Sequence, residues 1–197
     1  EEIARSINTL TMLTDTERAE LEALAANGPS DKAKALAADF ARQIRHPLYG
    51  NATRARDALI ALGAAGADAA AGEVTGHDRI PRLLAISVLR KVGSDAHVAA
   101  LADQLVDDEP AVRYHAALAL SERFATTLGY SYNDTTYGRK DGMARWKAFL
   151  ADRQQAEAAR AQAAAAAAAV AAPGTAPTDT NAATPGTPAT PSEAAKP

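Results

Sequence analysis

Apolar and polar residues alternate with the period of an amphipathic helix through residues 66–123, and the pattern occurs twice with a constant offset of 31 residues. In the first helix of each copy, apolar residues stand at positions i, i+3, i+4 and i+7: Ala67, Ala70, Ala71 and Val74, then Val98, Leu101, Ala102 and Leu105. The second helix repeats Arg82, Ala85, Val88 and Leu89 as Arg113, Ala116, Ala119 and Leu120. Such spacing gathers the apolar side chains on one face of each helix. A helix pair that recurs at this length predicts an all-α fold of the α-solenoid type.

Each second helix follows an acidic turn and has a proline near its start, at Pro81 and Pro110. Proline is tolerated in a first helical turn, where its missing N–H would have no partner. The run 109–120 reads E-P-A-V-R-Y-H-A-A-L-A-L and resembles the second helix of the HEAT-like repeat family, D-P-x-V-R-x-x-A-x-x-A-L. The copy at 78–89 departs from this motif, because Ile80-Pro81 stands where Pro-x-Val is expected.

The resemblance covers roughly residues 30–150 and implies a short right-handed α-solenoid of about three stacked helix pairs, an armadillo-type fold. Beyond the repeats, Gly129-Tyr130, then Asp134, then a helix carrying Trp146 look like the terminal segment of some exported bacterial HEAT-repeat proteins. We expect the following segments: an N-terminal helical cap (1–28), HEAT-like repeats with a degenerate first copy (29–129), an aromatic C-terminal cap whose helix starts near Asp141 (130–153), an alanine-rich helical extension (154–172) and a disordered Ala/Pro/Thr tail (173–197).

Four residues are candidates for binding a partner protein: Arg82, Arg113, Tyr130 and Tyr132. Each has a structural alternative. In the HEAT family, arginines at the start of the second helix bond acidic residues of neighbouring turns, and Asp78 and Asp108 are the partners that we expect here. The tyrosines, together with Trp146, are better explained by covering the last open face of the stack than by binding a ligand.

Composition and net charge narrow the classes of partner that the protein is expected to bind. The net charge of −3 and the isoelectric point near 5.8 provide no basic field, so nucleic acid and anionic membrane surfaces are disfavoured. No apolar run reaches the ~18 residues of a membrane span, and the chain has no cysteine for disulfides or thiolate metal sites. The absence of an initiating methionine, the absence of cysteine and the linker-like tail lead us to expect an exported protein, in the periplasm or at the cell surface, with the cytoplasm as the alternative.

Catalytic and metal motifs are missing from the sequence. The histidines at 46, 77, 97 and 115 have no metal-ligand spacing, no serine lies in a nucleophile elbow, and the acidic run 107–109 suits the positive end of a helix dipole better than a calcium loop. We therefore assign no catalytic, cofactor or metal residue. The function we expect is non-enzymatic: a protein-interaction or scaffold module, an accessory subunit of a larger, envelope-associated assembly. The alternatives are a HEAT-like enzyme, such as a bilin lyase or a DNA glycosylase, and an envelope anchor or spacer.

Overall fold

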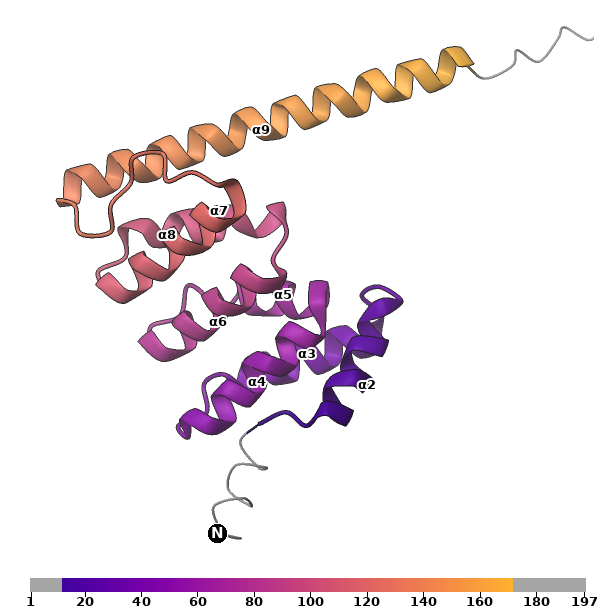
Figure 1. Cartoon of the computed structure of the whole chain (residues 1–197), viewed down its shortest axis with the longest axis vertical. Coiled ribbons are helices and arrows are strands. Elements are labelled where there is room, and N and C mark those ends of the chain that lie inside the picture. Colours follow the sequence, from indigo (N-terminus) through magenta and orange to yellow (C-terminus); the bar gives the residue numbers. More distant parts are fainter. Residues whose placement is uncertain (1–11, 172–197) are drawn as a thin grey trace, which may run out of the picture. The chain divides into compact units, whose positions relative to one another are not determined.

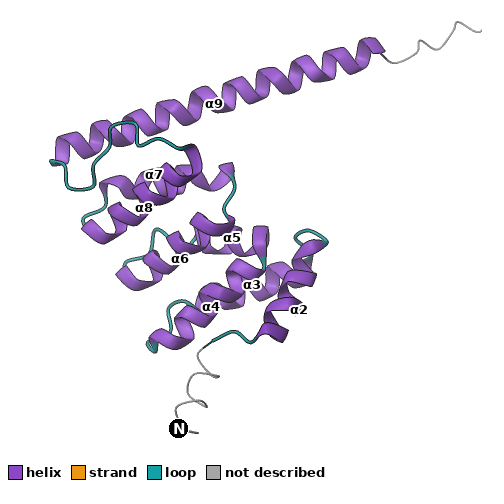
Figure 2. Ribbon diagram, viewed as in Figure 1, coloured by secondary structure: helices purple, strands orange, loops and turns teal. Residues whose placement is uncertain are grey.

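The computed structural model describes residues 12–171, and all regular structure within that range is helical (Figure 2), which confirms the all-α class. The helices are α2 (Asp15–Ala26), α3 (Asp31–Gln43), α4 (Tyr49–Ala61), α5 (Gly63–Ala71), α6 (Arg79–Val92), α7 (Val98–Asp103), α8 (Pro110–Phe124) and α9 (Thr136–Ala171), with 3₁₀ turns at Asp95–His97 and Gln104–Val106. The expectations for residues 1–11 and for the 173–197 tail lie outside the described residues.

The chain divides into two compact units, Glu1–Ala156 and Glu157–Pro197. In the first unit, consecutive helices pair as α3 with α4, α5 with α6, and α7 with α8. First helices pack on first helices, as α3 does on α5, and second helices pack in the order α4, α6, α8 (Figure 1). These contacts between neighbouring pairs are consistent with an α-solenoid. In the second unit, residues 157–171 continue α9 as a helix.

The core of the first unit is formed by the apolar helix faces that recur at an offset of 31 residues. All sixteen repeat residues named above are buried except Ala71 and Arg82, which are half-buried. Leu89 and Leu120 are 2% and 0% exposed. The apolar period therefore identified the faces along which the helices pack.

Side-chain capping bonds begin two of the helices. Thr14 and Glu17 form a reciprocal capping box at α2, because the Glu17 N–H donates to Thr14 Oγ1 at 3.2 Å and the Thr14 N–H donates to Glu17 Oε2 at 3.0 Å. At α3, Ser30 Oγ accepts the N–H of Ala33 at 3.2 Å. These bonds satisfy first-turn N–H groups that a helix leaves unpaired.

Small residues let neighbouring helices approach closely. A Cβ atom added to Gly66, in α5, would lie 1.9 Å from the carbonyl oxygen of Leu59 in α4. Only glycine fits this crossing, so the alanine- and glycine-rich composition is a packing requirement of the array.

α9 begins at Thr136, five residues before the predicted start near Asp141, so that boundary was wrong. Gly138 and Gly142 both lie within α9. A Cβ atom at Gly142 would lie 2.4 Å from the ring of Tyr130. This glycine makes room for the tyrosine, and that benefit offsets the low helix propensity of glycine.

Candidate binding surface

Arg113 is 5% exposed and bonds backbone carbonyl groups rather than a carboxylate. Its Nη1 donates to the carbonyl oxygens of Asp107 at 2.7 Å and Asp108 at 2.9 Å, and its Nε donates to that of Tyr132 at 2.9 Å. Asp108 is thus a partner of Arg113 as expected, but through its carbonyl oxygen and not through its side chain. Because α8 starts directly after this acidic turn, its arginine ties the turn before the helix to the loop after it.

Arg82 forms an ion pair with the side chain of Asp107, so the predicted partner, Asp78, is wrong. Both side chains are nearly buried, at 12% and 13% exposure. Asp107 belongs to the following repeat, and the bond links two neighbours of the stack. Neither arginine has a guanidinium group that faces solvent for a partner to bind.

Tyr130 is 8% exposed and its hydroxyl donates to the carbonyl oxygen of Leu105 at 2.5 Å. Burial raises the pKa of Tyr130 to about 12, so its phenol stays protonated. Tyr132 is half-buried, and its ring contacts that of Tyr114 edge-on, with centroids 5.1 Å apart. Of the four candidate residues, the two tyrosines both line accessible space, and Tyr132 is the more exposed of them.

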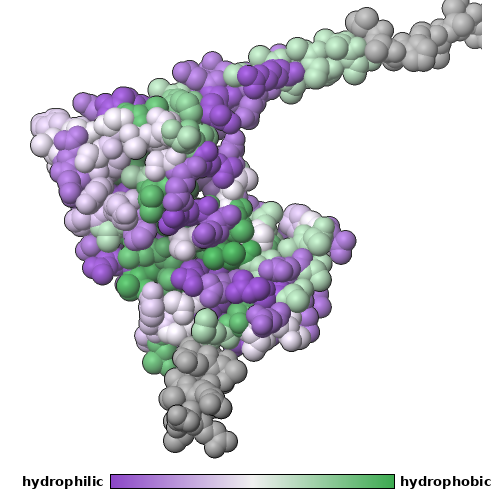
Figure 3. All heavy atoms as spheres, in the orientation of Figure 1, coloured by the Kyte–Doolittle hydropathy of each residue, from purple (hydrophilic) through white to green (hydrophobic). Residues whose placement is uncertain are grey.

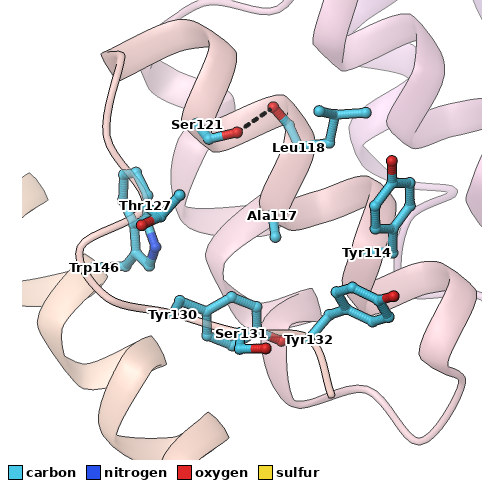
Figure 4. A pocket seen from close by; sticks show the side chains of 9 residues that line it. All are labelled: Tyr114, Ala117, Leu118, Ser121, Thr127, Tyr130, Ser131, Tyr132 and Trp146. Atoms are coloured by element: carbon cyan, nitrogen blue, oxygen red, sulfur yellow. Dashed lines mark hydrogen bonds between the residues drawn. The ribbon is translucent and has the colours of Figure 1, made fainter. Parts of the chain in front are cut away.

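That space is a cavity of about 200 Å³ between α8 and the loop that precedes α9, which we call the tyrosine cavity (Figure 4). Tyr114, Ala117 and Ser121 line it from one face of α8, Thr127 and Tyr132 from the loop, and Trp146 from α9. All the residues that line it are uncharged. Sequence analysis missed Tyr114 and Ser121, although their i, i+7 spacing around Ala117 places them on one helical face.

Trp146 is 1% exposed, and its ring packs against Phe124 and Phe149 at centroid distances of 5.7 and 5.8 Å. Its Nε1–H has no hydrogen-bond partner within the described part of the chain. Buried tryptophans usually place this donor against an acceptor. Trp146, which lines the tyrosine cavity, therefore holds a buried donor whose hydrogen bond is not satisfied within the described residues.

A second hollow lies where the second helices begin. It has a volume of about 370 Å³ and is lined by apolar and charged residues together: Ile44, Arg45, His46, Pro47, Tyr49, Asp78, Arg79, Ile80 and Pro81. We call it the proline hollow. Leu48 and Tyr49 beside it are 64% and 62% exposed, and Ile80 is 40% exposed. Figure 3 shows hydrophobic side chains reaching the surface over α6.

Ser94, His97 and Asp68 have the residue types of a catalytic triad but the geometry of a helix cap. The backbone N–H of Ser94 donates to His97 Nδ1 at 2.9 Å, and Ser94 Oγ lies 3.1 Å from the same nitrogen. His97 Nε2 lies 2.9 Å from Asp68 Oδ1. Because the backbone amide already occupies the Nδ1 lone pair, this nitrogen is not free to accept the hydroxyl proton. The cluster instead anchors the start of α7 on α5.

Among the residues that the structure describes, no group of three or more His, Asp or Glu side chains could hold a metal ion. Across the same range, 12–171, none of the helices combines the length and the apolar character that crossing a membrane requires. Neither protein-family models, nor curated proteins, nor solved structures give a match to this chain.

Proposed function

We propose that this protein is a non-enzymatic interaction module, a short right-handed array of HEAT-like repeats that binds another protein along the edge where its second helices begin. The observation that carries the proposal is the proline hollow with its exposed apolar rim, Leu48, Tyr49 and Ile80. Contiguous exposed apolar side chains around a hollow are typical of protein-binding sites, and tyrosine is enriched in them.

Charged side chains that form ion pairs lie next to the apolar side chains of this hollow. Arg45 bonds Glu73 at 2.6 Å, and Arg79 lies 3.9 Å from Glu109. An apolar centre with a polar border is the usual arrangement of a specific interface. The tyrosine cavity, of about 200 Å³, is smaller than the ~300–1,000 Å³ of sites for drug-sized ligands, so a tetrapyrrole bound by a bilin lyase would have to occupy the proline hollow instead.

The proposal extends to the role of an accessory subunit in an envelope-associated assembly of an exported protein. Its support is compositional: no cysteine, and a terminal segment rich in Ala, Pro and Thr. Fractionation of the native cells tests it. Recovery together with periplasmic or surface markers supports export, and recovery with cytoplasmic markers contradicts it.

The binding edge is tested with a double variant, Tyr49→Ser with Ile80→Ser, and with Tyr137→Ser as the matched control. Tyr137 is 83% exposed and lies outside the hollow. Proteins captured from the native source by the wild type are identified, purified and titrated calorimetrically. We expect the double variant to bind at least about tenfold more weakly, since central interface tyrosines often contribute 2 kcal/mol or more.

Tyr137→Ser is expected to bind as the wild type does. All three proteins should melt at similar temperatures, because the substituted side chains are exposed. Equal affinity of the double variant and the wild type for every captured protein would remove the hollow from the proposed function.

A further inference from the structure

The tyrosine cavity has the chemistry of a site for proline-containing peptide. Its walls are aromatic and uncharged, and two of the rings, Tyr114 and Tyr132, meet at an interplanar angle of 75°. Such a corner presents flat apolar surface on two sides of a small ring. Aromatic grooves of this kind bind polyproline II segments, whose extended conformation is largely formed before binding.

Polar groups in the cavity match the backbone of such a segment. The Trp146 Nε1–H, which is buried and has no partner in the described residues, can donate to a peptide carbonyl group. Ser121 Oγ already donates to the Leu118 carbonyl oxygen at 3.0 Å, so its lone pairs remain able to accept a peptide N–H (Figure 4). Polyproline II backbone forms no internal hydrogen bonds, so it offers both groups.

The size of the cavity restricts the occupant further. About 200 Å³ is less than drug-sized ligands require. It suits one pyrrolidine ring with the carbonyl group that precedes it. The absence of charge among the residues that line the cavity disfavours acidic or basic peptides, because a charged group would lose its hydration without gaining a counter-ion.

The chain itself contains a segment with this chemistry. Residues 184–192 read T-P-G-T-P-A-T-P-S, with proline at every third position and no charged residue. Polyproline II has three residues per turn, so a peptide of this sequence presents Pro185, Pro188 and Pro191 on one face. We infer that the tyrosine cavity of one molecule binds a Thr-Pro unit of residues 184–192 from a second copy of this chain. This site is separate from the proline hollow, so the two proposals can fail independently.

The chain contains one tryptophan, so indole fluorescence and the indole N–H resonance report on this cavity alone. The full chain is studied by sedimentation equilibrium over a wide concentration range, and the indole signal is recorded in parallel. The test variant is Pro185→Ala with Pro188→Ala and Pro191→Ala. The control is Pro173→Ala with Pro177→Ala, which removes prolines outside the three-residue period.

We expect wild type and control to associate as the concentration rises, with a parallel shift of the indole resonance. The triple variant should associate at least tenfold more weakly. An excess of the peptide TPGTPATPS should dissociate the wild type, and TAGTAATAS should not. Tyr132→Ala should also weaken association, and thermal melting verifies that this variant is folded.

Three results would overturn the inference. The first is a wild type that stays monomeric up to millimolar concentration. If the indole signal of that monomer still responds to the triple substitution, the segment occupies the cavity of its own chain, and the inference of a second copy is wrong. The second is association that does not depend on the three prolines. The third is an indole resonance that does not move when the peptide binds or the chain associates.

Discussion

Replacing Arg113 by methionine should destabilise the protein more than any exposed arginine replacement. Methionine keeps the apolar stem and removes the guanidinium group, which donates to three backbone carbonyl oxygens at 2.7–2.9 Å. A hydrogen bond to a charged group contributes about 1.5–3 kcal/mol, and the two bonds from Nη1 share one nitrogen, so two independent contributions are counted. Methionine also removes a charge that is costly to keep buried, and this gain offsets part of the lost hydrogen-bond free energy. The net loss is about 3–5 kcal/mol.

Urea and thermal unfolding followed by far-ultraviolet circular dichroism measure this loss. For a folded part of this size, about 2–4 °C accompanies each kcal/mol, so the melting temperature should fall by roughly 6–20 °C. Arg45→Met is the control, because Arg45 is 59% exposed and surface ion pairs contribute about 0–1 kcal/mol. Arg113→Lys keeps the positive charge but removes the planar guanidinium group, so it separates the effect of the charge from that of the directed hydrogen bonds. A single ammonium group does not reproduce the planar fork, so we expect this variant to recover less than half of the loss.

The reasoning fails if Arg113→Met melts within about 3 °C of the wild type. It also fails if lysine restores full stability, since the charge would then matter and the directed bonds would not. A large loss in the Arg45→Met control would show instead that long-range charge stabilises the array.

Three further predictions follow from the packing. Gly66→Ala should destabilise by at least 1–3 kcal/mol in urea unfolding, because its Cβ would lie 1.9 Å from the Leu59 carbonyl oxygen, whereas Gly72→Ala, with 3.7 Å to the nearest atom, should be close to neutral. Ala125→Gly should stabilise by about 1 kcal/mol, since Ala125 ends α8 with φ of 52°; an unchanged melting temperature would contradict strain there. The pKa of Tyr130, raised to about 12 from an ordinary value of 10, means that the folded state holds the phenolic proton more tightly than the unfolded state does. Its contribution to stability is complete below pH 10 and is lost as the pH rises toward 12, so alkaline unfolding should be less steep in Tyr130→Phe than in the wild type.

Helical periodicity in the sequence predicted which helix faces are buried, whereas the side-chain partners that depend on the path of a loop were not predicted. The stripes around Leu89 and Leu120 follow from helical spacing alone, and both are buried as predicted. The partner expected for Arg82 was wrong, and Arg113 bonds Asp108 through its carbonyl group, because a long side chain reaches several groups and the path of the turn decides among them. Asp107, rather than Asp78, lies within reach of Arg82.

The tyrosine cavity could be foreseen only in part. Tyr132 was a candidate from its position in an aromatic loop, and Tyr114 and Ser121 share a helical face that spacing reveals. The helix start was placed near Asp141, so the first turn of α9, which contains Gly138, was assigned to the preceding loop. The packing role of Gly142 appears only once Tyr130 is seen against α9. Local propensity was overridden there by tertiary contact.

The ion pair between Arg82 and Asp107 has a consequence for how the chain avoids misfolding. Repeats with similar apolar stripes can dock on the wrong neighbour, a characteristic hazard of repeat proteins. Aligning the apolar residues of α4 with those of α6 places Ala55 in α4 where α6 has Arg82. If the third repeat docked on the first, Asp107 would lose its ion-pair partner at a nearly buried site. The apolar faces are nearly interchangeable, so the ion pairs between the second and third repeats, Arg82 with Asp107, Arg79 with Glu109 and Arg90 with Glu122, distinguish the correct order of repeats from the skipped one.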